Sequence, residues 1–244
     1  MNDFLIAILN EQNYSVLDFP KSVAVIYKVE NNILMRLKNF SNFRGKMLGI
    51  TDLSFSINKN LKKILSDIIF EYRKFNFSGI FLDFKGESQS EFVLELDELC
   101  FKEKIPLYVP QSYAYVVNNA KIVINTAISG GCLKNIIEYA QMQYGTCRIC
   151  VQISLVACEF KIPSKNNAGK FMNFPINTNN SPVFFSETLC TNYFTKMDSE
   201  NSCIFTIFDD KTTFYKKLSL LNSLNVAEIF FDYIDIENTN FTIS

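Results

Sequence analysis

Three aspartates stand where short apolar runs end, and a lysine follows one of them closely. Asp52, Asp83 and Asp232 occupy these positions, and Lys85 lies two residues beyond Asp83. In a barrel of parallel strands, this edge carries the chemistry. Three carboxylates around one opening could bind a hard cation or a polar ligand, although separately solvated acids are the simpler interpretation. The Asp83–Lys85 spacing puts both side chains on one strand face, either as an internal ion pair or as a catalytic dyad.

The composition restricts the chemistry further. The 244 residues include no histidine, so the commonest general base, the usual partner of a serine or cysteine nucleophile and the commonest metal ligand are all missing. Any catalysis must use carboxylates, lysine, tyrosine or thiols. The 24 basic and 25 acidic residues leave a net charge of −1 without a long basic run, so neither a nucleic acid nor an anionic membrane is a favoured partner.

The cysteines and the hydropathy pattern indicate a reduced protein without a membrane span. Seven cysteines are an odd number, mostly embedded in apolar patterns, which favours free thiols in the cytoplasm. Cys147 and Cys150 form a lone C-x-x-C without a second pair, so we expect no metal and no cofactor. The apolar start lacks a basic leader region and reads as a first strand. No run of about 18 uncharged apolar residues is present.

Short apolar runs alternate with helical patterns from residue 45 onward, which predicts β-α units on a parallel sheet. The expected strands are 4–9, 46–53, 77–84, 106–109, 121–128, 148–160 and 227–234. The expected helices are one after an N-cap at Asn58, with its apolar face over 61–69, and others at 91–102, 133–144 and 212–224. We therefore predict an α/β fold, a single (β/α)8 TIM-type barrel over residues 1–244.

Two segments depart from this barrel pattern. Residues 23–38 have Glu30-Asn31-Asn32 between two apolar arms, which predicts a hairpin and makes the first fifty residues irregular. Residues 161–183 are rich in Asn, Pro, Lys and Ser and lack periodicity. They are expected to form a loop excursion over one barrel mouth rather than a linker between domains.

The run Phe77-Ser78-Gly79-Ile80-Phe81-Leu82-Asp83-Phe84-Lys85 resembles the fourth-strand signature of the family 18 glycoside hydrolases, F-D-G-I-D-L-D-W-E, at five of nine positions. Residues 208–210, the helix that follows them and residues 225–231 are similar to the family's final helix and eighth strand. Together these pieces cover about a third of the chain. The resemblance implies a chitinase-like barrel with saccharide as the first candidate ligand.

The same resemblance implies that the catalytic acid is missing. Family members use a glutamate at the end of this strand as general acid, while the substrate's own acetamido group attacks the sugar. That position is Lys85 here, and Ser78 and Phe81 replace two aspartates, so only Asp83 is kept. Lysine is a poor proton donor at neutral pH because its ordinary pKa is about 10.4. Glu87 is not expected to take over, because it follows the end of the strand.

Aromatic and backbone groups supply further candidates for ligand binding. The position of the family's sugar-binding tryptophan is approximately Asp232, and the chain contains no tryptophan. Tyr113, Tyr115 and Tyr233 could each offer an aromatic face near the mouth, although packing is the commoner role of a half-buried tyrosine. Ser129 and Gly130, between a strand and a helix, either cradle an anion or form a helix cap with a tight turn.

Three hypotheses follow. The first is a non-catalytic, degenerate glycosidase-like barrel that binds a saccharide or a protein partner at its C-terminal mouth. The second is an enzyme with relocated chemistry, using Asp83, Lys85, Asp52 or Asp232 on another substrate; a strongly lowered pKa of Lys85 would favour it, and an ion-paired lysine would oppose it. The third is a structural or assembly protein whose barrel is plugged by side chains such as Phe81.

Overall fold

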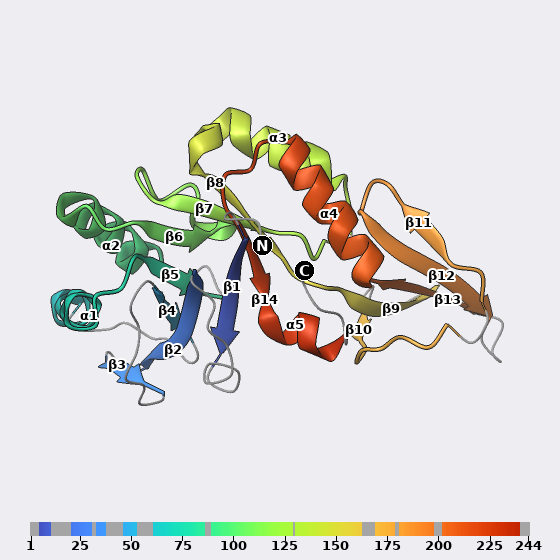
Figure 1. The fold of residues 1–244 in the computed structure, drawn as a ribbon, viewed down its shortest axis with the longest axis horizontal. Coiled ribbons are helices and arrows are strands. Elements are labelled where there is room, and N and C mark those ends of the chain that lie inside the picture. The colour runs from blue at the N-terminus through green and yellow to red at the C-terminus, as the bar shows by residue number, and fades with distance from the viewer. Residues whose placement is uncertain are drawn as a thin grey trace.

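Eight parallel strands close into a barrel in the computed structural model (Figure 1). The structure describes residues 5–10, 21–30, 33–37, 46–52, 61–85, 89–128, 130–162, 169–178, 181–197 and 202–239. The barrel strands are β1 (Leu5–Asn10), β2 (Ser22–Glu30), β4 (Met47–Thr51), β5 (Ile80–Asp83), β6 (Leu107–Pro110), β7 (Lys121–Asn125), β8 (Ile149–Ile153) and β14 (Ile229–Asp232). Since β1 pairs in parallel with both β2 and β14, the sheet closes, which confirms the predicted TIM-type barrel.

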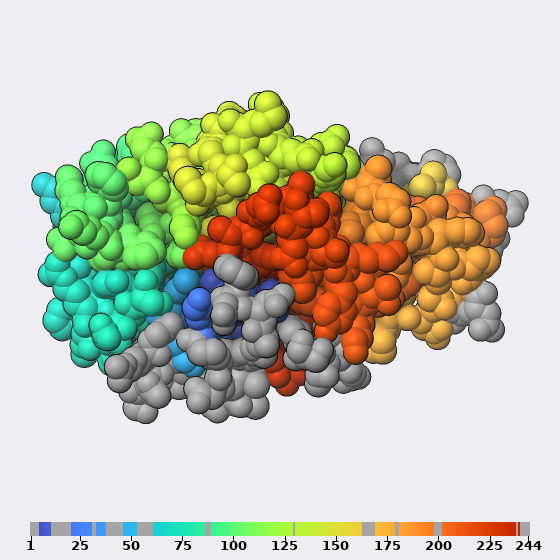
Figure 2. Space-filling model, turned by 45° about the horizontal axis from the view of Figure 1, so that its top comes forward, coloured from blue at the N-terminus to red at the C-terminus, as the bar shows by residue number. Residues whose placement is uncertain are grey.

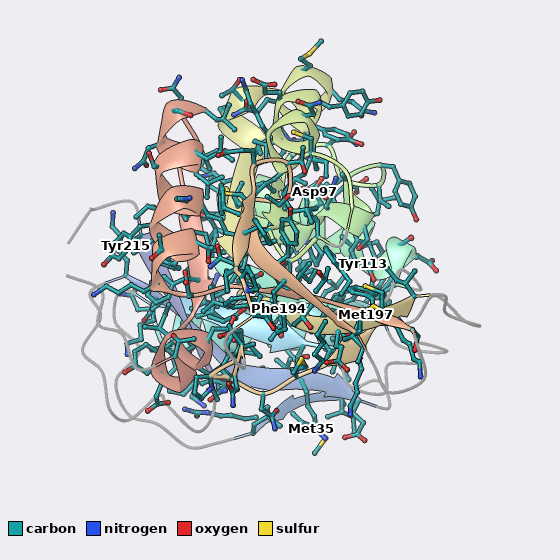
Figure 3. All side chains as sticks on the ribbon, turned by 90° about the vertical axis from the view of Figure 1, so that its right-hand side faces the viewer. Met35, Asp97, Tyr113, Phe194, Met197 and Tyr215 are labelled. Atoms are coloured by element: carbon teal, nitrogen blue, oxygen red, sulfur yellow. The ribbon has the colours of Figure 1, made fainter. Side chains whose placement is uncertain are left out.

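The predicted hairpin at residues 23–38 is also confirmed. Strand β3 (Ile33–Arg36) pairs antiparallel with β2 and therefore lies outside the parallel barrel. Its Met35 side chain is 42% exposed and points outward at the lower edge of Figure 3. The first fifty residues thus differ from a plain barrel repeat, because β2 pairs in parallel with β1 and β4 in the barrel and also antiparallel with β3 in the hairpin.

The helices surround the barrel and bury the outward faces of its strands. They are α1 (Leu61–Lys74), α2 (Ser90–Glu103), α3 (Leu133–Tyr144), α4 (Lys211–Ser223) and α5 (Tyr233–Asn238), with short 3₁₀ turns η1 (Gln111–Tyr113) and η2 (Thr146–Arg148). Helix α4 begins with a capping box, in which Asp210 and Thr213 each accept a hydrogen bond from the other's backbone amide. Helices α3 and α4 lie side by side, where the Gln141 amide donates to the Leu224 carbonyl (Figure 1).

The barrel interior is packed with apolar side chains rather than open. Phe81, Tyr108 and Phe230 form its aromatic centre, with ring centroids 5.0 Å apart for Phe81–Phe230 and 5.4 Å apart for Tyr108–Phe230. Gly49 on β4 faces the backbone of β2, and a Cβ atom there would lie 2.7 Å from the Cα of Val25. Only glycine allows this approach of two strands.

A second sheet is inserted between β8 and α4. Its strands lie in the order β10 (Lys170–Phe171), β9 (Ala157–Ile162), β13 (Cys203–Phe208), β12 (Thr191–Met197) and β11 (Phe184–Ser186), all antiparallel. It occupies one end of the molecule beside α4, as Figures 1 and 2 show. Phe194 is buried in this sheet, whereas Met197 is 68% exposed (Figure 3).

This sheet corrects two expectations about the chain between 148 and 210. The single strand expected at 148–160 is two strands, because residues 154–156 leave the barrel and enter the second sheet. The loop excursion expected at 161–183 contains β10 and belongs to a segment that forms strands from 157 to 208. The run from 149 to 160 is apolar almost throughout, so periodicity carried no sign of the break.

Two expectations from the sequence concern the state of the cysteines and the presence of a membrane span. All seven cysteines are free. None of the helices in the described part of the chain has the length and apolar character needed to cross a membrane.

Candidate functional site

A pocket of about 270 Å³ lies at the C-terminal mouth of the barrel, over the ends of β5, β6, β7 and β8. Its floor includes Phe81, which belongs to the packed interior. Its polar lining consists of Asp83, Lys85, Gln111, Asn125 and Gln152. The predicted alternation on β5 is confirmed, since Ile80, Leu82 and Phe84 pack outward in the core shared with the helices.

Asp83 and Lys85 form an ion pair within this pocket. The Lys85 Nζ donates to Asp83 Oδ1 at 2.8 Å, with the lysine side chain 74% exposed and the aspartate 27% exposed. Burial raises the pKa of Asp83, and the charges of Asp232 and Asp52 raise it further, while the ammonium of Lys85 opposes the change.

The same charges keep Lys85 protonated. Partial loss of hydration at the pocket lowers the pKa of the largely exposed Lys85, but the neighbouring carboxylates, Asp83 foremost, outweigh this and hold the pKa above its ordinary value. A lysine that is to act as a base or Schiff-base nucleophile needs a lowered pKa. The geometry and charge therefore favour the ion-pair interpretation of Asp83 and Lys85 over a catalytic dyad.

Asp52 holds the backbone at the end of β5. Both of its carboxylate oxygens accept a hydrogen bond from the Lys85 amide, at 3.0 and 3.1 Å. The main chain of Lys85 is thus anchored to β4, while its side chain reaches into the mouth. Asp52 has a positioning role that its place at a strand end did not reveal.

Asp232 closes the opposite side of the mouth. Its Oδ2 accepts hydrogen bonds from Gln152 Nε2 at 2.8 Å and from Ser154 Oγ at 2.9 Å. The Asn125 side-chain amide donates to Ser154 Oγ at 3.0 Å, so a polar chain runs along this rim. The three predicted acids therefore do gather at one mouth, where Asp232 and Asp52 both act on the charge of Asp83. Among the described residues, no three acidic or thiol side chains form a group able to hold a metal ion.

The three candidate tyrosines lie in different environments, and the structure contradicts only Tyr113 as a ligand-binding candidate. Tyr113 is fully buried and packs edge-on against Phe84, with centroids 6.2 Å apart, so it is a core residue and offers no face to a ligand (Figure 3). Its burial follows from η1, which turns the chain back onto the barrel after β6. Tyr115 is 69% exposed, with its hydroxyl 3.2 Å from that of Ser90. Tyr233 is partly buried against the core at the start of α5.

The first amide of α3, after the glycine turn, is hydrogen-bonded within the protein. Leu133, the first residue of α3, donates its amide to the Thr188 carbonyl at 2.8 Å, so this donor is used within the protein. Gly131 adopts φ +85°, as a tight turn requires, and Gly130 is exposed. Ser129 lies outside the described residues. The turn interpretation is favoured over an anion cradle.

Three consecutive residues that connect the barrel to the second sheet are held by carboxylates. Besides Ser154, the Leu155 amide donates to Asp235 Oδ2 at 2.9 Å, and the Val156 amide donates to Asp209 Oδ2 at 2.8 Å. Burial, together with the charges of Asp232 and Asp209, raises the pKa of Asp235 to about 7. The hydrogen bond from Leu155 and the charge of Lys217 lower this pKa but do not outweigh the rise.

Asp209 in turn pairs with Lys217 inside the protein. The Lys217 Nζ lies 2.6 Å from Asp209 Oδ2, and both side chains have no exposed surface. The pair therefore joins α4 to the chain segment that returns from the second sheet.

Sequence reasoning missed the amides Gln111, Asn125 and Gln152. A signal for two of them exists, because strand alternation places Gln152 on the same face as Cys150 inside the barrel and puts Asn125 at the last position of its strand. No comparable signal exists for Gln111, which lies in the turn after β6.

Solved structures with known activities share this barrel. No protein-family model and no curated protein sequence matches the chain. The spore cortex-lytic enzyme SleL of Bacillus cereus superposes with a TM-score of 0.64 at 15% identity, over 98% of this chain and 74% of that one. A GH18 chitinase of Cycas revoluta, in complex with (GlcNAc)4, gives a TM-score of 0.59 at 11% identity, over 93% and 94% of the two chains. The chain has the fold of the family 18 chitinases.

A third similar structure is the chitinase-like agglutinin of Robinia pseudoacacia. It superposes with a TM-score of 0.60 at 12% identity, over 94% of each chain. At these identities the likeness shows the fold alone. The expectation from the strand signature, a barrel of the family 18 type, is confirmed.

Proposed function

We propose that this protein is a glycosidase-like barrel that binds a saccharide at its C-terminal mouth without hydrolysing it. The observation that carries the proposal is the Asp83–Lys85 ion pair, since a protonated lysine stands where the resemblance puts the general acid. A glycosidase of this kind needs a proton donor beside the scissile bond. Lysine held above its ordinary pKa does not serve that purpose at neutral pH.

The lining of the mouth supports saccharide as the ligand. Gln111, Asn125 and Gln152 supply amide donors and acceptors, and Asp83 supplies a carboxylate, which together suit a ring bearing several hydroxyl groups. A volume of about 270 Å³ is slightly below the range of roughly 300–1,000 Å³ typical of ligand pockets, so we expect one sugar ring to enter. The Robinia protein is named as an agglutinin and offers a precedent for this barrel in a binding role.

The other two hypotheses have less support. An enzyme that uses Lys85 as a base or Schiff-base nucleophile would need a neutral amine, whereas Lys85 is ion-paired with Asp83. A plugged barrel matches the packed centre around Phe81 and Phe230, but a pocket remains above it. The seven free thiols fit a cytoplasmic location.

The test combines a hydrolysis assay with a binding assay. Wild type and Lys85→Glu are incubated with fluorogenic chitobiose and chitotriose, and their retention on chitin and on peptidoglycan is measured in parallel. We expect no turnover by wild type and retention on at least one polymer. Gln152→Ala should weaken retention because it removes a polar group of the pocket, whereas Glu98→Gln, on the exposed face of α2, serves as the control.

Each outcome has a clear meaning. Turnover by wild type would overturn the non-catalytic part of the proposal and indicate relocated acids. Absence of retention on every polymer would overturn the binding part. Turnover that appears only in Lys85→Glu would support descent from an active site that lost its acid.

A further inference from the structure

The described side chains at the mouth carry more negative than positive charge. Asp83 lines the pocket, and Asp52 and Asp232 lie close enough to act on its charge, while Lys85 is the one cation among the described residues that line the pocket. Among the described residues whose charges act on one another here, three carboxylates stand against one ammonium, which leaves an excess of negative charge at a concave, partly buried site. Such a site attracts cations and discriminates against anions.

Lys85 itself shows that an ammonium group fits against Asp83. Its Nζ lies 2.8 Å from Asp83 Oδ1, the length of a charge-assisted hydrogen bond. The lysine side chain is 74% exposed, and an ion pair with so much solvent exposure is weak. Because Asp52 accepts hydrogen bonds from the backbone amide of Lys85, the main chain can keep its place while the exposed side chain leaves the pocket.

We infer that the mouth pocket selects saccharides bearing a free, protonated amine, such as glucosamine oligomers, over their N-acetylated counterparts. The inference rests on the proposed saccharide binding and specifies its ligand class. The sugar ammonium takes the place of Lys85 Nζ on Asp83, and the ring hydroxyls meet the amides of Gln111, Asn125 and Gln152. An acetamido group would instead place a neutral amide and a methyl group against a charged carboxylate, which costs the carboxylate its hydration without replacing it.

Calorimetric titration with three trisaccharides tests this selectivity. The ligands are the glucosamine trimer, chitotriose and cellotriose, which carry amines, acetamides and hydroxyls at the same ring position. At pH 6 and low salt we expect the glucosamine trimer to bind at least about tenfold more tightly than the other two. The advantage should shrink as salt is added, because screening weakens partly exposed charge pairs.

Variants separate the roles of the charged groups. Asp83→Asn should abolish the preference for the glucosamine trimer, and Lys85→Gln should tighten its binding because the competing ammonium is gone. Glu98→Gln removes one acid from the exposed face of α2 and should leave all three affinities unchanged. If Asp83→Asn fails to fold, the result with Lys85→Gln decides: unchanged or weaker binding of the glucosamine trimer contradicts the inference.

The outcomes distinguish this inference from the proposal on which it rests. Equal or tighter binding of chitotriose would overturn the selectivity and leave saccharide binding intact. Failure of all three sugars to bind, together with no retention on chitin or peptidoglycan, would overturn the proposed function itself. Spermidine, which carries amines without a sugar ring, is the remaining control, and binding as tight as that of the glucosamine trimer would reduce the site to one for simple polyamines and overturn the inference.

Discussion

Replacing Lys217 by methionine tests how the second sheet is joined to the barrel. The change keeps a long flexible side chain in α4 but removes the ammonium that lies 2.6 Å from Asp209 Oδ2. Neither side chain has exposed surface, so water cannot take the place of the lost partner. Breaking a buried ion pair on one side costs about 3–5 kcal/mol, because it leaves an uncompensated charge inside the protein.

The expected loss is large enough to measure by thermal and urea unfolding. For a chain of this size, each kcal/mol shifts Tm by about 2–4 °C, so a loss of 3–5 kcal/mol corresponds to roughly 6–20 °C. The double variant Asp209→Asn with Lys217→Met should recover part of the loss, because it leaves no buried charge. Its asparagine can still accept the hydrogen bond that Val156 donates to Asp209.

Lys216→Met is the matched control, because this neighbouring lysine on α4 is exposed and stacks over the Phe185 ring. It should cost no more than about 1 kcal/mol. A Lys217→Met variant that loses less than about 1 kcal/mol, or a double variant less stable than the single one, would refute the reasoning that the buried charge dominates.

Three further predictions concern the barrel and its rim. Phe230→Ala removes a fully buried ring from the aromatic centre and should lower the free energy of unfolding in urea by about 3–5 kcal/mol. A loss of less than about 1 kcal/mol would mean that the interior can collapse around the gap. Gly49→Ala should destabilise the protein by about 1–3 kcal/mol, because the added Cβ would lie 2.7 Å from the Cα of Val25. The control Gly130→Ala has no atom within 4 Å of the added Cβ and should change stability by no more than about 0.5 kcal/mol. Equal effects of the two substitutions would contradict the argument that β2 and β4 approach closely at Gly49. The pKa of Asp235 is about 7 in the folded protein and about 3.9 in an unfolded chain. The folded state therefore binds the carboxyl proton of Asp235 more tightly, and the protein loses stability as the pH rises from about 4 to 7. Asp235→Asn should therefore gain stability relative to wild type between pH 5 and pH 8 in urea titrations, and parallel pH profiles of the two proteins would contradict the assignment.

Sequence periodicity was sufficient for the barrel but not for the insertion. Strands β4, β5 and β7 and helix α3 lie close to their predicted positions, because each of these strands is followed by a segment with a helical period. The second sheet lacked such a boundary. Residues 149–160 read as one apolar strand, and only the departure of Ser154, Leu155 and Val156 from the barrel, fixed by Asp232, Asp235 and Asp209, divides it into two.

For the candidate site, the sequence predicted the position of the acids but not their roles. Asp52, Asp83 and Asp232 could be placed at one mouth from the sequence, because all strands of a parallel barrel end at the same rim. Their different roles could not be assigned. Asp83 pairs with Lys85, Asp52 holds a backbone amide, and Asp232 binds Gln152 and Ser154, and each role depends on neighbours that lie far away in the chain.

By itself the sequence determined the β-α repeat and the inward face of β5, since both follow from the spacing of apolar residues along the chain. That Lys85 takes the position of a catalytic glutamate is what the resemblance to the family 18 strand signature implies. The tertiary structure decided the ion pairing of Lys85 with Asp83, the burial of Tyr113 and the pairing of Asp209 with Lys217. Burial and charge at a site depend on what packs against it from other elements, and a local pattern does not contain that information.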